Sequence, residues 1–152
     1  MKIIFLCHGN ICRSPMAEYI FKDLVKKYNL DDRFEIISRG TSNEEYLNDI
    51  YPKAKEVLIK NGISFNRHQA RKITKAEYDD ARYILAMEEY NIHNLERLFN
   101  VDRSKVLLLR TFSCGDKEIS DPWYNDQFDK SFDEIYEGCR DFLDFIVQIY
   151  FK

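Results

Sequence analysis

The chain has 152 residues, of which 45% are apolar and 32% charged, and this composition excludes a disordered or fibrous protein. Its formal net charge of −3 comes from scattered acidic and basic residues, so we expect no nucleic-acid partner. No apolar run approaches the roughly 18 residues that span a bilayer, and the apolar N-terminus, residues 2–6, is too short for a signal peptide. We therefore expect a cytoplasmic protein without membrane contact that folds as one domain over residues 1–152.

The first half of the chain alternates between predicted strands and helices. Residues 2–6 form a short apolar, β-branched run, which predicts a buried strand. After a tight loop, apolar residues recur at helical spacing and predict a helix over residues 15–28, with Ser14 as its expected cap. A second strand is expected over residues 34–38, followed by a polar loop and a helix over residues 52–61.

The same alternation continues in the second half. In chain order, the pattern predicts a capping box at residues 74–77, a strand over 83–87, a helix over 88–99 and a strand over 106–109. Residues 110–131 are predicted to be irregular, and loops of such length in compact domains usually carry function. A final helix is expected over residues 132–150. This order implies a single-domain α/β fold, a four-stranded parallel sheet with helices on both faces and a ligand site beyond the carboxyl ends of the strands.

The strongest functional signal is the segment Cys-His-Gly-Asn-Ile-Cys-Arg-Ser at residues 7–14 (loop 7–14), between the first strand and the first helix. Backbone N–H groups of such a loop can point inward around an anion, and the following helix adds the partial positive charge of its N-terminus. Arg13 adds a planar fork for two phosphate oxygens. The same field stabilises a thiolate, so Cys7 is a candidate nucleophile that can attack phosphorus without a metal.

Three other residues of this loop have expected structural roles. Ser14 can donate a hydrogen bond to the sulfur of Cys7, and Gly9 and Asn10 tolerate the positive φ that a tight curl requires. The alternative is a buried structural cysteine at a strand end, with an arginine that caps another element. The glycine, the asparagine, the serine and the place between strand and helix favour a phosphate-binding loop.

A candidate general acid lies in the irregular stretch. A thiolate that displaces an alkoxide needs an acid to protonate the leaving oxygen, and Asp121 can supply that proton. Asp121 is followed by Pro122, Trp123 and Tyr124, and the two aromatic rings can form the walls of a slot for a phenyl ring. Considered alone, the segment is also compatible with an ordinary Asp-Pro turn whose aromatic residues cover the core.

With these motifs, the chain resembles the low-molecular-weight protein tyrosine phosphatase family over essentially its whole length. The matching features are the loop from Cys7 to Pro15, Ser38, His68 with Ala70 and Arg71, Ala86-Met87 with Asn91, and Asp121-Pro122-Trp123-Tyr124. The resemblance implies hydrolysis of phosphotyrosine and small aryl phosphates through a phosphocysteine on Cys7, with Asp121 as acid and then base. It implies that phosphate is held by Arg13 and by the loop residues His8, Gly9, Asn10, Ile11, Cys12 and Ser14, without a cofactor or metal.

The resemblance also implies partners and supporting roles. The expected partner is a phosphotyrosine-containing protein or peptide, phosphate is product and inhibitor, and the chain is a monomer or a weak dimer. Asn10 holds the loop through hydrogen bonds with Ser14, Ser38 and His68, which makes His68 structural, a catalytic base being the alternative. Cys12 is implied to form a reversible disulfide with Cys7 under oxidation, a packing role being the alternative.

One departure from the family bears on substrate choice. The loop after the second strand often carries a Trp that lines the aromatic slot, but an ungapped reading puts Glu44 there, with Tyr46 two residues later. Either Tyr46 replaces the missing ring, or the slot is more open and more acidic and disfavours acidic phosphopeptides. Glu44, Tyr46, Trp123 and Tyr124 are therefore the candidate contacts to the rest of the substrate.

Other activities on the same loop are disfavoured by particular residues. Arsenate reductases of this fold need two further cysteines after the third strand, and none lies between Cys12 and Cys114. Protein arginine phosphatases of the family carry a Thr where this chain has Ile11, so Ile11 favours a phosphotyrosine ester. A cysteine phosphocarrier would need no acid, and an inactive phosphate-binding module would not need Cys7, Arg13 and Asp121 together.

Overall fold

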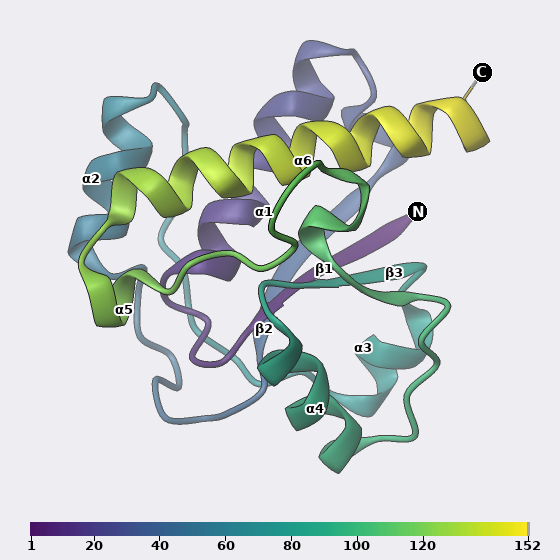
Figure 1. The fold of residues 1–152 in the computed structure, drawn as a ribbon, viewed down its shortest axis with the longest axis horizontal. Helices are drawn as coiled ribbons and strands as arrows, with labels where there is room; N and C mark the ends of the chain where they lie inside the picture. Colours follow the sequence, from purple (N-terminus) through teal and green to yellow (C-terminus); the bar gives the residue numbers. More distant parts are fainter. Residues whose placement is uncertain (152) are drawn as a thin grey trace.

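Four parallel strands form the predicted sheet, in the order β2-β1-β3-β4 (Figure 1). The strands are β1 (Lys2–Cys7), β2 (Glu35–Gly40), β3 (Tyr83–Ala86) and β4 (Val106–Leu108). The structure is a computed structural model of the chain and describes residues 1–151. β1 pairs with β2 on one side and with β3 on the other, so the carboxyl end of β1, at Cys7, lies in the middle of the sheet edge.

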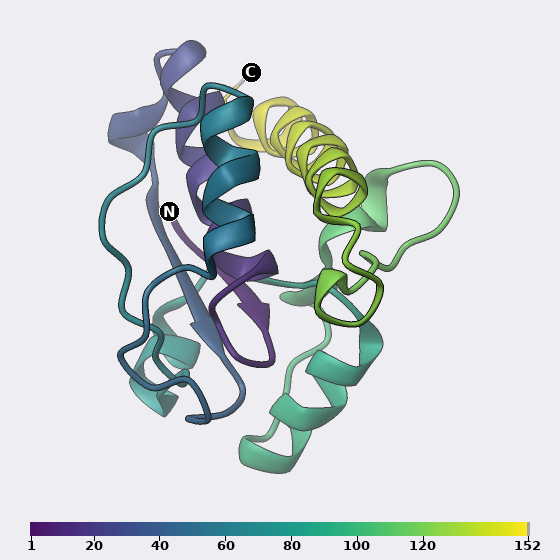
Figure 2. The ribbon, with the colours of Figure 1, turned by 90° about the vertical axis from the view of Figure 1, so that its left-hand side faces the viewer.

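Helices cover both faces of the sheet because side chains along a strand alternate between its two faces. The main helices are α1 (Arg13–Lys27), α2 (Pro52–Lys60), α3 (Lys75–Asp80), α4 (Glu89–Leu98) and α6 (Phe128–Tyr150). In β1, Ile3 and Phe5 pack into a core with α1, α2 and α6, whereas Ile4 and Leu6 pack into a second core with α3 and α4. Figure 2 shows α1, α2 and α6 on one side of the sheet and α3 and α4 on the opposite side. The predicted α/β architecture is confirmed.

Two predicted helix boundaries are confirmed by their local geometry. The N–H of Glu77 donates to Oγ1 of Thr74 at 3.2 Å, and the N–H of Thr74 donates to Oε1 of Glu77 at 3.0 Å, which is a capping box at the start of α3. α2 begins at Pro52 and is followed by Gly62 at φ 70°, a left-handed conformation that glycine adopts without steric cost.

Two other boundary predictions are wrong. Ser14 does not cap α1, because the helix already begins at Arg13 and the hydroxyl of Ser14 bonds Cys7 and Asn10 instead. The stretch over residues 110–131 is less irregular than predicted, since it contains the short 3₁₀ helix η2 (Leu109–Phe112) and the helix α5 (Pro122–Asn125).

The last helix, α6, is longer than predicted. It begins at Phe128, four residues before the expected start, because the ring of Phe128 is buried and stacks on Tyr51, with centroids 5.9 Å apart. This tertiary contact stabilises a first turn whose sequence is otherwise polar. Neither α6 nor any other helix within residues 1–151 is long and apolar enough to cross a membrane.

A short 3₁₀ helix, η1 (Asp31–Arg33), was not expected from the sequence and joins α1 to β2. It lies on the surface, with no buried residue, and has no part in the site.

Candidate active site

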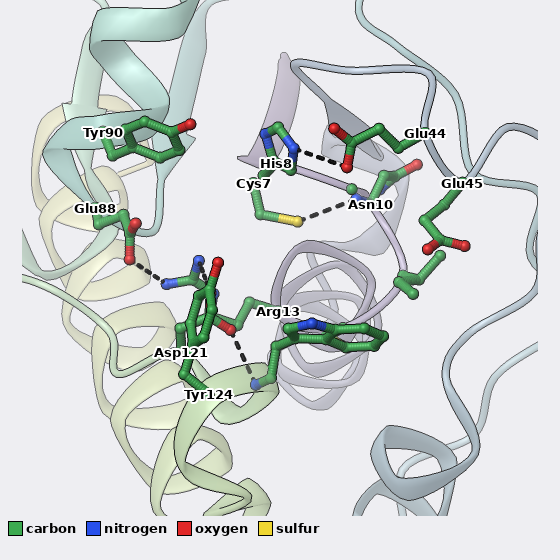
Figure 3. A pocket seen from close by; sticks show the side chains of 14 residues that line it. Cys7, His8, Asn10, Arg13, Glu44, Glu45, Glu88, Tyr90, Asp121 and Tyr124 are labelled. Carbon is green, nitrogen blue, oxygen red and sulfur yellow. Dashed lines mark hydrogen bonds and ion pairs between the residues drawn. The ribbon is translucent and has the colours of Figure 1, made fainter.

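A pocket with a cavity volume of about 460 Å³ lies at the carboxyl end of β1 (Figure 3). The predicted residues that line it are Cys7, His8, Gly9, Asn10, Ile11, Cys12, Arg13, Glu44, Asp121, Trp123 and Tyr124. Three further lining residues, Glu45, Glu88 and Tyr90, were not singled out as site residues by the sequence analysis. Segments far apart in the chain therefore meet where a parallel sheet of this kind is expected to bind its ligand.

Cys7 is the last residue of β1, and its side chain is almost completely buried. Its Sγ lies 2.9 Å from Oγ of Ser14 and accepts a hydrogen bond from the backbone N–H of Asn10, with an N–S distance of 3.3 Å. Two polar hydrogens can therefore face the sulfur.

Asn10 holds the curl of loop 7–14. Of the two residues expected to tolerate the positive φ of this curl, Asn10 adopts it, with a φ of 61°, and Gly9 does not. The Asn10 side-chain amide donates to Oγ of Ser14 at 2.9 Å and to Oγ of Ser38 at 3.1 Å, and its Oδ1 accepts from the N–H of Arg71 at 3.0 Å. Both N–H donors of the buried amide are thereby used, and its oxygen accepts one hydrogen bond.

His68 and Glu18 also stabilise loop 7–14, His68 directly and Glu18 through Ser38. The Nε2–H of His68 donates to the carbonyl oxygen of Asn10 at 2.6 Å, and since a carbonyl only accepts, Nε2 carries the proton. Burial lowers the pKa of His68, although the hydrogen bond to Asn10 acts in the opposite direction. The hydroxyl of Ser38 donates in turn to Oε1 of the buried Glu18 at 2.7 Å, a contact that the sequence analysis did not anticipate. His68 therefore contacts the loop backbone and not the sulfur.

Arg13 is buried and held by three acceptors. Its Nη1 donates to Oε2 of Glu88 and to the carbonyl oxygen of Ile119, both at 2.8 Å, and its Nη2 donates to Oδ2 of Asp121 at 3.4 Å. Burial by itself lowers the pKa of Arg13, but the nearby charges of Cys7, Asp121 and Glu88 outweigh it and raise the pKa. A guanidinium has five N–H donors, so three occupied donors leave two for an anion.

Asp121 reaches the pocket from the second half of the chain. It precedes α5 as its N-cap, and its Oδ1 accepts from the N–H of Trp123 at 3.0 Å. This leaves Oδ2 directed toward Arg13 (Figure 3). The short helix α5 thus fixes one carboxylate oxygen and presents the other to the pocket.

Aromatic rings surround the mouth of the pocket. Trp123 and Tyr124 are 55% and 86% exposed, which is far more than residues that cover a core, and so the Asp-Pro segment is not merely a core-covering turn. Tyr90 lies on the opposite wall, near His8, with ring centroids 6.1 Å apart. The position of Tyr90 just after β3 was a usable signal, because ligand sites of this fold lie at the strand ends.

The prediction that Tyr46 lines the same pocket is wrong. Tyr46 lies in a second cavity of about 550 Å³ with Arg39 and Arg71. Glu44 does lie at the rim of the first pocket, where its Oε2 is 3.2 Å from Nε2 of His8. The tight turns of this loop, with Leu47 at φ 68°, point neighbouring side chains in different directions. Counting residues along the sequence therefore does not predict which of them faces the pocket. The rim is consequently acidic at the place where a second ring was considered.

Cys12 is a free, buried thiol beside the nucleophile candidate Cys7. Burial, followed by the charges of Cys7 and Asp121, raises the pKa of Cys12 to about 12. It is thus a protonated thiol at neutral pH. Within residues 1–151, no group of three or more His, Cys, Asp or Glu side chains is placed to hold a metal ion.

Comparison with known proteins identifies this arrangement. Residues 2–149 match the family model described as low molecular weight phosphotyrosine protein phosphatase. The chain is 34% identical over 146 residues to the low-molecular-weight protein-tyrosine-phosphatase YfkJ of Bacillus subtilis, covering 94% of each chain. It is 36% identical over 149 residues to the phosphatase of the same description from Schizosaccharomyces pombe, covering 94% of this chain and 95% of that one.

Solved structures agree with the sequence relatives. The crystal structure of YfkJ superimposes with a TM-score of 0.94 at 32% identity, covering 99% of this chain and 96% of that one. YwlE, an arginine phosphatase solved as a cysteine-to-serine mutant with a phosphorylated active-site serine, has a TM-score of 0.87 at 28% identity, covering 99% and 98% of the two chains. The chain therefore belongs to the low-molecular-weight phosphotyrosine protein phosphatase family, whose members are phosphoric monoester hydrolases.

Proposed function

We propose that the protein hydrolyses phosphotyrosine in a phosphoprotein or peptide by a two-step mechanism on Cys7. The observation that carries the proposal is the meeting of the Cys7 sulfur, the Arg13 guanidinium and the Asp121 carboxylate in one pocket, with Oδ2 of Asp121 3.4 Å from Nη2 of Arg13. Nucleophile, anion clamp and acid are the three parts that such a reaction needs.

In the first step, the Cys7 thiolate attacks phosphorus. The S–P bond forms while the P–O bond to the tyrosine breaks, and Asp121 transfers its proton to the leaving phenolate oxygen. The two free donors of Arg13 and the N–H groups of loop 7–14 bind the phosphoryl oxygens as charge builds up on them. The tyrosine leaves as a neutral phenol.

In the second step, water attacks the phosphocysteine. Asp121, now a carboxylate, accepts a proton from the water as the new P–O bond forms, and the S–P bond breaks to return the Cys7 thiolate. Ser14, whose Oγ lies 2.9 Å from the sulfur, donates to the departing thiolate. Phosphate is released, and as a product held by the same groups it also inhibits.

The aromatic walls support a phosphotyrosine ester as substrate. Tyr90, Trp123 and Tyr124 line the pocket together with the wholly apolar side chain of Ile11. A phenyl ring gains from contact with such rings, whereas a phosphorylated guanidinium gains from polar partners. Phosphoarginine is the second candidate substrate, because YwlE, a structural relative, is an arginine phosphatase.

The mechanism is tested by turnover of p-nitrophenyl phosphate and of a phosphotyrosine peptide in the presence of a chelator. Cys7→Ser and Arg13→Ala should abolish measurable turnover of both substrates, while Cys114→Ser, at an exposed cysteine outside the pocket, retains it. Full activity in Cys7→Ser would refute the mechanism.

The acid role of Asp121 has a sharper signature. Asp121→Asn should lower kcat by about 10²- to 10⁴-fold for the peptide, and by less for p-nitrophenyl phosphate, because p-nitrophenolate leaves readily without a proton. Asp133→Asn, at an exposed position of α6, is the matched control and should change neither rate. Equal losses for the two substrates would contradict the assignment, and a wild-type preference for phosphoarginine peptides would move the function to the second candidate.

A further inference from the structure

Negative charge is concentrated at the mouth of the active-site pocket. Its lining includes the carboxylates of Glu44, Glu45, Glu88 and Asp121 but the guanidinium of Arg13 alone. Arg13 is already bonded to Glu88 and Asp121, so it does not compensate Glu44 and Glu45. These two residues lie together on one rim, across the pocket from Glu88 (Figure 3). A pocket built for a phosphate dianion thus has an acidic rim.

Glu44 and Glu45 differ in their surroundings. The side chain of Glu44 is 71% exposed, and its Oε2 lies 3.2 Å from Nε2 of His8. Glu45 is half-buried, and its Oε2 accepts a hydrogen bond from the neutral amide of Asn48 at 2.7 Å. No cation pairs with Glu45 among the contacts of residues 1–151. Glu45 is therefore the partly desolvated carboxylate of this rim that lacks a positive partner.

Glu45 also lies directly against loop 7–14. A Cβ added to Gly9 would be 3.4 Å from Cγ of Glu45, which is ordinary van der Waals contact. A partly buried carboxylate at this place disfavours an approaching phosphate dianion unless a positive charge arrives with it. The substrate that satisfies both groups carries a phosphate and, beside it, a cation.

We infer that Glu45, together with Glu44, forms a subsite for a basic side chain next to the phosphotyrosine, so that the preferred substrates are phosphopeptides with Arg or Lys flanking the phosphorylated residue. The inference rests on the proposed function, since it names the substrates of the same pocket. Arg is expected to exceed Lys, because its planar fork can bind a carboxylate through two hydrogen bonds.

The test compares three phosphotyrosine peptides of equal length in which the flanking residues are Arg, Ala or Glu. At low ionic strength, kcat/KM should fall by about two- to five-fold from the Arg to the Ala peptide, and again from the Ala to the Glu peptide. The differences should shrink when the salt concentration rises from about 0.01 M to about 1 M, because the screening length then falls from about 30 Å to about 3 Å.

Variants locate the effect at the rim. In Glu45→Gln the ratio of the Arg to the Ala peptide should fall toward one, and in the double variant Glu44→Gln/Glu45→Gln the penalty on the Glu peptide should disappear. Glu56→Gln removes the same charge from an exposed position of α2 and should leave the ratios at the wild-type values. Because the readout is a ratio within each variant, a general loss of activity does not affect it.

Failure of the inference differs from failure of the proposed function. Equal kcat/KM for the three peptides, or a preference that persists in the double variant or disappears in Glu56→Gln, overturns the subsite while leaving the phosphatase activity intact. Absence of turnover of p-nitrophenyl phosphate and of all three peptides by the wild-type protein overturns both. A higher kcat/KM for a phosphoarginine peptide than for every phosphotyrosine peptide overturns the substrate class.

Discussion

Replacing Asn10 with alanine removes the side chain that holds loop 7–14. The side chain makes three hydrogen bonds, to Ser14, Ser38 and Arg71, and the residue is wholly buried at φ 61°. At about 1 kcal/mol for each net hydrogen bond, the loss is about 3 kcal/mol. Alanine in the left-handed region adds about 1 kcal/mol, so the free energy of unfolding should fall by about 4 kcal/mol.

Asn10→Gly separates the two contributions. Glycine loses the same hydrogen bonds but adopts positive φ without steric cost, so its loss should be about 3 kcal/mol. Urea unfolding of both variants measures the difference, and kcat/KM for p-nitrophenyl phosphate should fall in both because the loop no longer holds the N–H of Asn10 against the sulfur of Cys7. Equal free energies of unfolding for Asn10→Ala and Asn10→Gly would refute the backbone-strain contribution. Free energies of unfolding within about 0.5 kcal/mol of wild type for both variants would refute the hydrogen-bond contribution.

Three further predictions concern neighbouring groups. Gly40→Ala would place a Cβ 2.7 Å from the carbonyl oxygen of His8, so urea unfolding should show a loss of about 1–3 kcal/mol, whereas Gly9→Ala, whose Cβ meets Glu45 at 3.4 Å, should lose less. The lowered pKa of His68 means that the unfolded chain binds a proton at this residue more readily than the folded chain. The free energy of unfolding should therefore decrease as pH falls from about 7 through the ordinary His value near 6.5. His68→Gln should flatten this decrease, and a pH dependence of stability unchanged in the variant would contradict the prediction. Burial raises the pKa of Cys12 far above neutral pH. Conversion of a Cys7 sulfenic acid into the Cys7–Cys12 disulfide should therefore accelerate about tenfold per pH unit from pH 6 to 8, as followed by peptide mapping after peroxide treatment. Cys12→Ser should give sulfinic acid at Cys7, and a rate of disulfide formation independent of pH would exclude thiolate attack by Cys12.

Local sequence determined the order of elements and the centre of the site. Strand runs such as residues 2–6 and the capping box at Thr74 carry their signals within a few residues, and so do Cys7, Asn10 and Arg13, which share one loop between a strand and a helix. Parallel strands then bring their carboxyl ends to one edge, which made the edge itself predictable. Even Asp121 could be selected, because a loop with an acid and two aromatic rings fits that chemistry.

Tertiary structure decided the contacts between segments that the chain separates widely. Arg13 donates hydrogen bonds to Glu88 and Ile119, and Glu18 accepts one from the hydroxyl of Ser38. Tyr51 stacks on Phe128 and so stabilises the first turn of α6. None of these pairs is close in sequence. Side-chain direction in the loop after β2 also depends on turns fixed by its contacts, which is why Tyr46 lies in the second cavity and Glu45 on the rim. Local propensity and spacing specify elements and motifs, but only packing selects which side chains face one another.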